Sequence, residues 1–145
     1  GETKGGIRAA EAGIVLVDAV SGVEVGTELI WNYLDERSLP RAIVINKMNR
    51  DTANYERVFG EMKGIFDVRL VLMQLPIGRK EAFKGVVDLV TMQAYLEDGK
   101  KPTEIPADLV DVAEALRVEL IDAIAEQDDD ILMKYLEGEE LTAAE

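Results

Sequence analysis

The sequence predicts an α/β fold, in which a parallel β-sheet with flanking helices is followed by a smaller α+β region. Two continuous aliphatic runs, residues 14–17 and 42–45, are typical of strands that are buried on both faces of a parallel sheet. A helical pattern separates them, so that strand, helix and strand follow one another within about 30 residues, the size of a βαβ unit. After Asp67 the pattern changes to short strands and a long acidic helix.

Two helices are predicted around the first of these strands. Residues 7–12 are expected to end one helix, with Gly13 as its C-cap. Residues 26–37 are expected to form the next, with Thr27 as its N-cap, and Pro40 follows its end. The residues on its apolar side are Leu29, Ile30, Tyr33 and Leu34.

A third helix is predicted to begin after Asn54, whose side chain can cap it. Its apolar residues recur at spacings of three and four, which is a strong amphipathic pattern. They are Tyr55, Val58, Phe59, Met62, Ile65 and Phe66. We interpret the aromatic residues among them as core residues rather than as a platform for stacking bases.

The second region is predicted to contain strands at residues 70–76 and 84–90, joined by a polar loop around residues 78–80. A break is expected at residues 99–106, which contain one glycine and two prolines.

Two helices are predicted to complete the chain, a long acidic one at residues 107–127 and a short one at residues 131–136 that ends at Gly138. The apolar stripe of the long helix consists of Leu109, Ala113, Leu116, Leu120 and Ile124. The formal net charge is −13, and residues 104–145 hold 14 acidic and only two basic residues. We expect no direct nucleic-acid binding by this acidic third, because phosphates would be repelled. A solvated helix face is the ordinary explanation for such charge, and a basic protein partner is the alternative.

Composition also limits the chemistry of the chain. It contains no Cys, so disulfides and thiolate chemistry are excluded. It contains no His, so the commonest general base is absent and any metal site would have to use oxygen ligands. No apolar run approaches the roughly 20 residues of a membrane helix, and no signal peptide is visible. We therefore expect a cytoplasmic chain with no membrane partner.

A polar sequence, Asn46-Lys47-Met48-Asn49, follows the second predicted strand directly, and Asp18 stands at the end of the first. In parallel sheets, ligands bind beyond the carboxyl ends of the strands, so this sequence is a candidate binding site. By itself, its spacing also fits an ordinary loop between a strand and a helix, where asparagines are common turn formers.

Five segments that span nearly the whole chain carry a family resemblance. They are VLVDAVSGVEVGTE (15–28), LPRAIVINKMNR (39–50), MQLPIG (73–78), FKGVVDLVTMQAY (83–95) and KYLEGEELT (134–142). In this order they resemble translation elongation factor G. FKGVVDLV and YLEGEELT are the specific ones, since they resemble a subdomain that this factor inserts into its GTP-binding domain.

The resemblance implies a partial P-loop-GTPase-like parallel sheet with flanking helices, followed by an inserted α+β subdomain. Residues 1–67 would be the middle portion of the GTP-binding domain, and residues 68–145 the inserted subdomain, called G-prime. The parent protein would bind GTP with Mg²⁺ and hydrolyse it on the ribosome, which drives translocation. The ribosome and the ribosomal stalk protein would be its partners.

The polar sequence resembles NKxD, the box with which GTPases bind guanine, so the resemblance assigns base binding to Asn46, Lys47, Met48 and Asn49. Asn46 would bond the purine edge, and Lys47 would lay its stem along the base plane. The family has Asp in place of Asn49, because an acceptor-only carboxylate takes two guanine N–H groups. A carboxamide offers one acceptor and one donor, which predicts weaker guanine specificity and a better fit to xanthine. Asp51 would replace that carboxylate only if the loop refolded.

Other parts of a GTPase are absent from the sequence. The glycines of residues 1–6 are followed by Ile7 and Arg8, where the phosphate loop GxxxxGK[ST] requires Lys and Ser or Thr. The family's DTPGH box, first switch and late SA-type loop are also absent. We therefore expect Gly1 to be an internal cut point of a longer protein. The fragment alone is expected to contain no catalytic or metal-binding residue, and neither to bind GTP tightly nor to hydrolyse it.

Two alternatives remain from the sequence. The chain would act as a protein-interaction module if the acidic helix docks the ribosomal stalk protein without nucleotide binding. The second alternative is that the chain is an unrelated small α/β protein. As a fragment, the chain would leave its two predicted sheet strands without the neighbours present in the parent, and their edges would be exposed to self-association.

Overall fold

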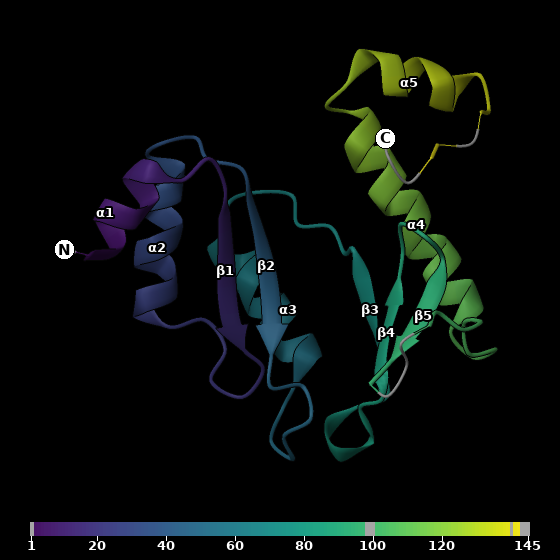
Figure 1. Cartoon of the computed structure of the whole chain (residues 1–145), viewed down its shortest axis with the longest axis horizontal. Helices are drawn as coiled ribbons and strands as arrows, with labels where there is room; N and C mark the ends of the chain where they lie inside the picture. Colours follow the sequence, from purple (N-terminus) through teal and green to yellow (C-terminus); the bar gives the residue numbers. More distant parts are fainter. Residues whose placement is uncertain (1, 98–100, 140, 143–145) are drawn as a thin grey trace. The chain divides into compact units, whose positions relative to one another are not determined.

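The computed structural model describes residues 2–97, 101–139 and 141–142 (Figure 1). It confirms the predicted fold class, since a parallel sheet with flanking helices is followed by a small antiparallel sheet and further helices. The chain divides into two compact units, Gly1–Val68 with Arg79–Ala82, and Arg69–Gly78 with Phe83–Glu145.

The first unit is built around a two-stranded parallel sheet. Its elements are α1 (Glu2–Ala9), β1 (Gly13–Asp18), α2 (Val25–Asp35), β2 (Arg41–Asn46), α3 (Tyr55–Ile65) and the short 3-10 helix η1 (Lys80–Ala82). The strands pair in register from Gly13 opposite Arg41 to Asp18 opposite Asn46. The predicted strand–helix–strand unit is therefore confirmed.

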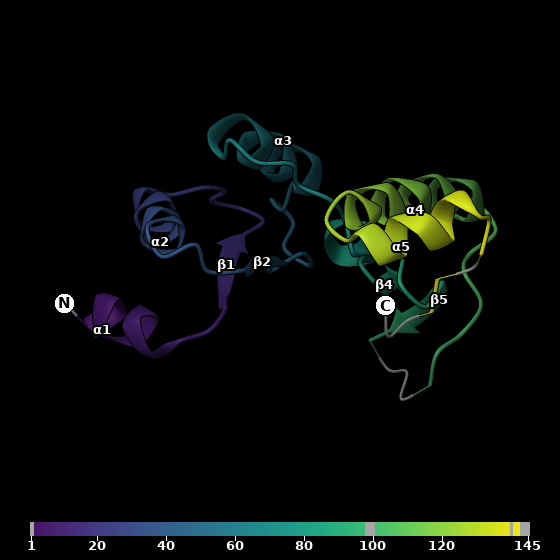
Figure 2. The same ribbon diagram turned by 90° about the horizontal axis from the view of Figure 1, so that it is seen from above.

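The sheet of this unit is buried on one face. Val15 and Val17 are 3% and 2% exposed, whereas Ile14 and Leu16 are 72% and 64% exposed. Helices α2 and α3 lie on the same side of the sheet (Figure 2), and Trp31 of α2 stacks on the Phe66 ring just after α3. The prediction of burial on both faces is wrong, because successive side chains point to opposite faces and one layer of helices covers only one of them.

The first helix is shorter than predicted at its carboxyl end. It ends at Ala9, and Gly13 is the first residue of β1 rather than a C-cap, with its N–H donating to the Pro40 carbonyl at 2.9 Å. A β-carbon on Gly13 would lie 2.8 Å from the Leu34 side chain. The glycine therefore serves close packing of α2 against the start of the strand.

The second helix begins at Val25, and Thr27 is not its N-cap. Glu24 holds that position, and Thr27 Oγ1 accepts the Glu24 N–H at 3.3 Å from within the first helical turn. The third helix agrees with its prediction. Asn54 caps it by accepting the Arg57 N–H at 3.0 Å.

The second unit is an antiparallel sheet with two helices. Its elements are β3 (Gln74–Ile77), β4 (Gly85–Asp88), β5 (Gln93–Leu96), α4 (Val110–Ala125) and α5 (Asp129–Leu136), and the strand order is β3-β4-β5. Its core consists of Ile77, Val87, Leu89, Ala94, Ala113 and Leu120, with Leu109, Leu116 and Ile124 packed against it. The predicted apolar stripe of the long helix is thus confirmed as its packed face.

The strand predictions of this unit need correction. β3 begins at Gln74 rather than at residue 70, β4 ends at Asp88 rather than at residue 90, and β5 is absent from the prediction. Asp88 Oδ1 accepts the N–H groups of Val90 and Thr91 at 2.9 and 2.8 Å, which forms a turn inside an apolar run. Gly99 of the predicted break lies outside the described residues.

Candidate functional site

The two parallel strands end side by side at one edge of their sheet. Asp18 and Asn46, the last residues of β1 and β2, are partners in the strand register. The turn after β1 and the loop after β2 both leave from this edge (Figure 1). The predicted polar sequence therefore lies where ligands bind in parallel sheets.

Asn46 connects the two loops. Its carbonyl accepts the Ala19 N–H at 2.9 Å, and its side-chain Oδ1 accepts the N–H of Lys47 at 2.8 Å. Within the described part of the chain, its amide NH₂ has no partner. That group is available to an external acceptor.

Lys47 is held in an uncommon conformation. Its φ of 59° lies in the left-handed region, which few residues other than glycine adopt. Its Nζ lies 2.5 Å from Oδ2 of Asp18, and the two side chains are 53% and 20% exposed, respectively. The hydrogen bond from Lys47, and after it that from the Val20 N–H, holds the pKa of Asp18 below its ordinary value. Asp18 is therefore an ionised anchor for the lysine ammonium at neutral pH.

Met48 is half-buried, whereas Asn49 is exposed. Among residues 2–97, 101–139 and 141–142, the Asn49 side chain has no hydrogen-bond partner. The N–H of Arg50 donates to the Lys47 carbonyl at 3.2 Å, and the N–H of Ala53 donates to the Arg50 carbonyl at 3.0 Å, so successive turns shape the loop. The structure thus joins Lys47 to Asp18, and it leaves the amide of Asn49 open to solvent.

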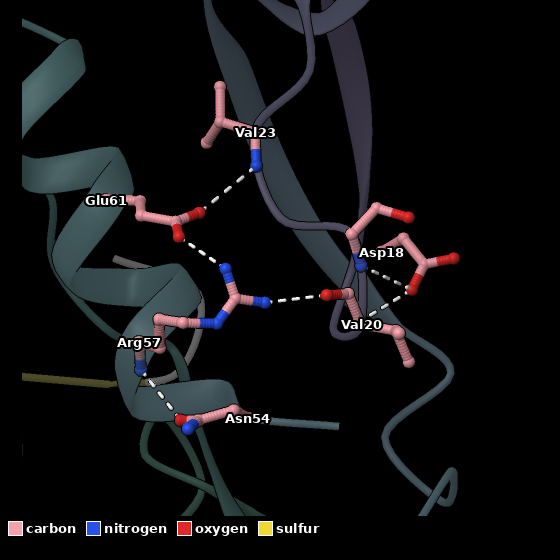
Figure 3. Close-up of polar contacts among 7 residues, drawn as sticks. Asp18, Val20, Val23, Asn54, Arg57 and Glu61 are labelled. Atoms are coloured by element: carbon pink, nitrogen blue, oxygen red, sulfur yellow. Dashed lines mark hydrogen bonds and ion pairs between the residues drawn. The ribbon is translucent and has the colours of Figure 1, made fainter. Parts of the chain in front are cut away.

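The turn after β1 is fastened to helix α3 (Figure 3). Asp18 Oδ1 accepts the Val20 N–H at 2.7 Å, and the Val20 carbonyl accepts a hydrogen bond from Arg57 Nη2 at 2.6 Å. Arg57 also forms an ion pair with Glu61, whose Oε2 accepts the Val23 N–H at 3.4 Å. These contacts fix the backbone that carries Asp18.

The pairing of Asp18 with Lys47 is not part of the sequence prediction, which places Asp18 only at the end of its strand. The pattern signals only that the two residues lie at one edge of the sheet, not that they pair. Each residue follows or ends one of two neighbouring parallel strands, and the carboxyl ends of parallel strands meet at the same edge of a sheet.

The site combines amide groups, one ammonium and one carboxylate, which suit hydrogen bonding to a planar polar ligand. Within the described residues, no three acidic side chains gather so as to hold a metal ion. Of the helices in the described part of the chain, none is long and apolar enough to cross a membrane.

A parallel strand–helix–strand unit with a polar loop at its carboxyl edge defines an α/β domain of the ligand-binding type. The chain belongs to the elongation factor Tu GTP binding domain family, which it matches over residues 1–136. A crystal structure of a protein from Thermus thermophilus is similar, with 33% sequence identity and a TM-score of 0.82. The match covers 97% of this chain and 21% of that chain, so this chain spans about a fifth of the length of that protein.

Proposed function

We propose that this chain is part of the GTP-binding domain of a translational GTPase that resembles elongation factor G. Residues 1–67 are the middle portion of that domain, and residues 68–145 are the inserted G-prime subdomain. The family match over residues 1–136 carries the proposal. The change of compact unit after Val68 supports the division into two parts, although Arg79–Ala82 of the second part belong to the first compact unit.

The parent protein binds GTP with Mg²⁺ and hydrolyses it on the ribosome in the cytoplasm, which drives translocation during protein synthesis. The part of that site in this chain is the loop Asn46–Asn49, which contacts the guanine base. The sequence has no GxxxxGK[ST] phosphate loop, which in P-loop GTPases cradles the phosphates and supplies a Mg²⁺ ligand, so we assign those contacts to other segments of the parent. The isolated chain accordingly binds GTP weakly and does not hydrolyse it, and micromolar affinity in a calorimetric titration with GTP and Mg²⁺ would contradict this.

The geometry of Asn46 and Lys47 supports their roles in base binding. The unpartnered NH₂ of Asn46 suits an acceptor on the purine edge. The ammonium of Lys47 is held by Asp18, so its aliphatic stem stays at the carboxyl edge of the sheet, where it can lie along the base plane.

Asn49 sets the base specificity of this loop. Guanine presents two donors, its ring N–H and its 2-amino group, and a carboxamide accepts only one of them. A donor facing a donor costs about 1–3 kcal/mol, the penalty of an unsatisfied polar group. Xanthine has an oxygen in place of the 2-amino group, so the Asn49 amide matches xanthine with one acceptor and one donor.

The experiment for base binding compares variants of the complete GTPase that contains this chain. Lys47→Ala and Asn46→Ala are each expected to weaken GDP binding about tenfold, the loss of one hydrogen-bonding or packing group in a polar site. Arg50→Ala is the matched control, because Arg50 lies in the same loop and its side chain is exposed. Equal affinities for all four proteins, measured by equilibrium titration with fluorescent GDP, would contradict the assignment.

A second role, docking of the ribosomal stalk protein, is supported by the surface of helix α4. Val112 and Val118 are 47% and 51% exposed on a helix with many acidic residues. Apolar side chains among carboxylates suit a basic amphipathic partner. Val118→Asp is expected to weaken capture of the stalk protein without changing GDP affinity. Unchanged capture by this variant and by Val112→Asp would remove α4 as the docking surface.

A further inference from the structure

Lys47 is the strained residue of the candidate loop, and three contacts hold it. Its left-handed φ of 59° is unfavourable for a residue with a β-carbon. Its N–H donates to Asn46 Oδ1 at 2.8 Å, and its carbonyl accepts the Arg50 N–H at 3.2 Å. Both contacts are local to the loop. The ion pair with Asp18, 29 residues earlier in the chain, is the contact that ties the lysine to another element.

The two carboxylate oxygens of Asp18 have separate partners. Oδ2 accepts from Lys47 Nζ at 2.5 Å, and Oδ1 accepts from the N–H of Val20 at 2.7 Å. The second bond fixes the side chain of Asp18 against its own turn. Oδ2 is thereby directed at the position of Lys47 across the sheet edge.

The turn itself is held by helix α3. Arg57 donates to the Val20 carbonyl at 2.6 Å, and Glu61 accepts the Val23 N–H at 3.4 Å (Figure 3). The carboxylate of Asp18 is therefore held by β1, by its own turn and, through that turn, by α3. A free lysine side chain has large rotamer entropy, which a fixed anchor removes before any ligand arrives.

We propose that Asp18 is a positioning residue for nucleotide binding, which holds the stem of Lys47 in place to receive the base. This assignment rests on the proposed function, in which Lys47 contacts guanine. Asp18 itself touches no part of the nucleotide. Because the pair is partly exposed, its contribution to the stability of the fold is small, and its main effect is the placement of Lys47.

A double-mutant cycle in the complete GTPase tests the assignment. Asp18→Asn keeps an acceptor for the Val20 N–H and removes the charge that holds Lys47. It is expected to weaken GDP binding by about threefold to tenfold, the cost of ordering one long side chain on binding. In a Lys47→Met background, Asp18→Asn is expected to have no further effect, since the lysine it acts through is absent.

The cycle separates the outcomes. If Asp18→Asn weakens GDP binding equally with Lys and with Met at position 47, Asp18 acts through its turn and not through Lys47. That result would overturn the positioning role and leave the proposed function standing. No weakening in either background would also overturn the positioning role. A wild-type protein that binds no guanine nucleotide would overturn the proposed function, and the positioning role with it.

Discussion

A β-carbon added to Gly22 would lie 2.2 Å from Oε2 of Glu61, so the turn after β1 meets helix α3 with no space for a side chain. Gly22 also has a φ of 79°, in the left-handed region that glycine adopts without steric cost. This close approach lets Glu61 accept the Val23 N–H and lets Arg57 reach the Val20 carbonyl. The hydrogen bonds between α3 and the turn that carries Asp18 therefore depend on a glycine at position 22.

Gly22→Ala is expected to destabilise the chain by about 1–2 kcal/mol, because an alanine is strained at this φ and Glu61 must move. Gly60→Ala is the matched control within α3, since a β-carbon there has no atom within 4 Å. It is expected to stabilise by about 0.5–1 kcal/mol, as alanine is the better helix former. Urea denaturation of the three proteins measures both changes. A Gly22→Ala protein as stable as wild type would contradict the tight contact between turn and helix.

Because only one face of the sheet is buried, substitutions at neighbouring positions of a strand are expected to change the stability of the fold by different amounts. Val17→Ala is expected to cost about 2 kcal/mol, because Val17 is 2% exposed and two buried methyl groups are lost. Leu16→Lys is expected to change stability by less than about 0.5 kcal/mol, since Leu16 is 64% exposed. The lysine should also reduce any self-association through that face, which sedimentation measures. Similar losses of stability at both positions would contradict one-sided burial.

The ion pair between Asp18 and Lys47 predicts that the stability of the fold depends on pH in the acid range. The pKa of Asp18 is lower in the folded chain than its ordinary value, first because of Lys47 and then because of the Val20 N–H. A lowered folded pKa means that the pair stabilises the fold above the unfolded pKa of about 3.9 and that this contribution is lost as pH falls below it. The stability difference between wild type and Asp18→Asn should therefore be constant from about pH 5 to 7 and shrink below about pH 4. A difference that stays constant down to the acid transition would show that Lys47 does not hold Asp18.

The sequence predicts the elements that have strong periodicity and fails where local chemistry decides. Helix α3 and the packed stripe of α4 follow from apolar spacing, and both are observed. The turn at Asp88 lies inside an apolar run, so β5 could not be separated from β4 by hydrophobicity alone. Gly13 resembles a helix terminus in sequence, yet its role is set by the side chain of Leu34.

For the candidate site, the position of the loop could be predicted, but its side-chain partners could not. Residues 46–49 follow a strand in the sequence, and the structure has them at the carboxyl edge of the sheet. The ion pair between Asp18 and Lys47 depends on strand register and on the turn that directs Asp18 Oδ2. Register is a tertiary property, and no spacing within either segment encodes it.

The relative affinity of the complete GTPase for GDP and XDP, in wild type and in Asn49→Asp, tests the central claim most directly. Asn49→Asp is expected to shift the preference toward GDP by about tenfold or more, since it restores an acceptor for both guanine donors. Asp51→Asn is the control and is expected to leave the preference unchanged. An unchanged preference in Asn49→Asp, or a loss of GDP binding in Asp51→Asn, would contradict base recognition by the loop Asn46–Asn49.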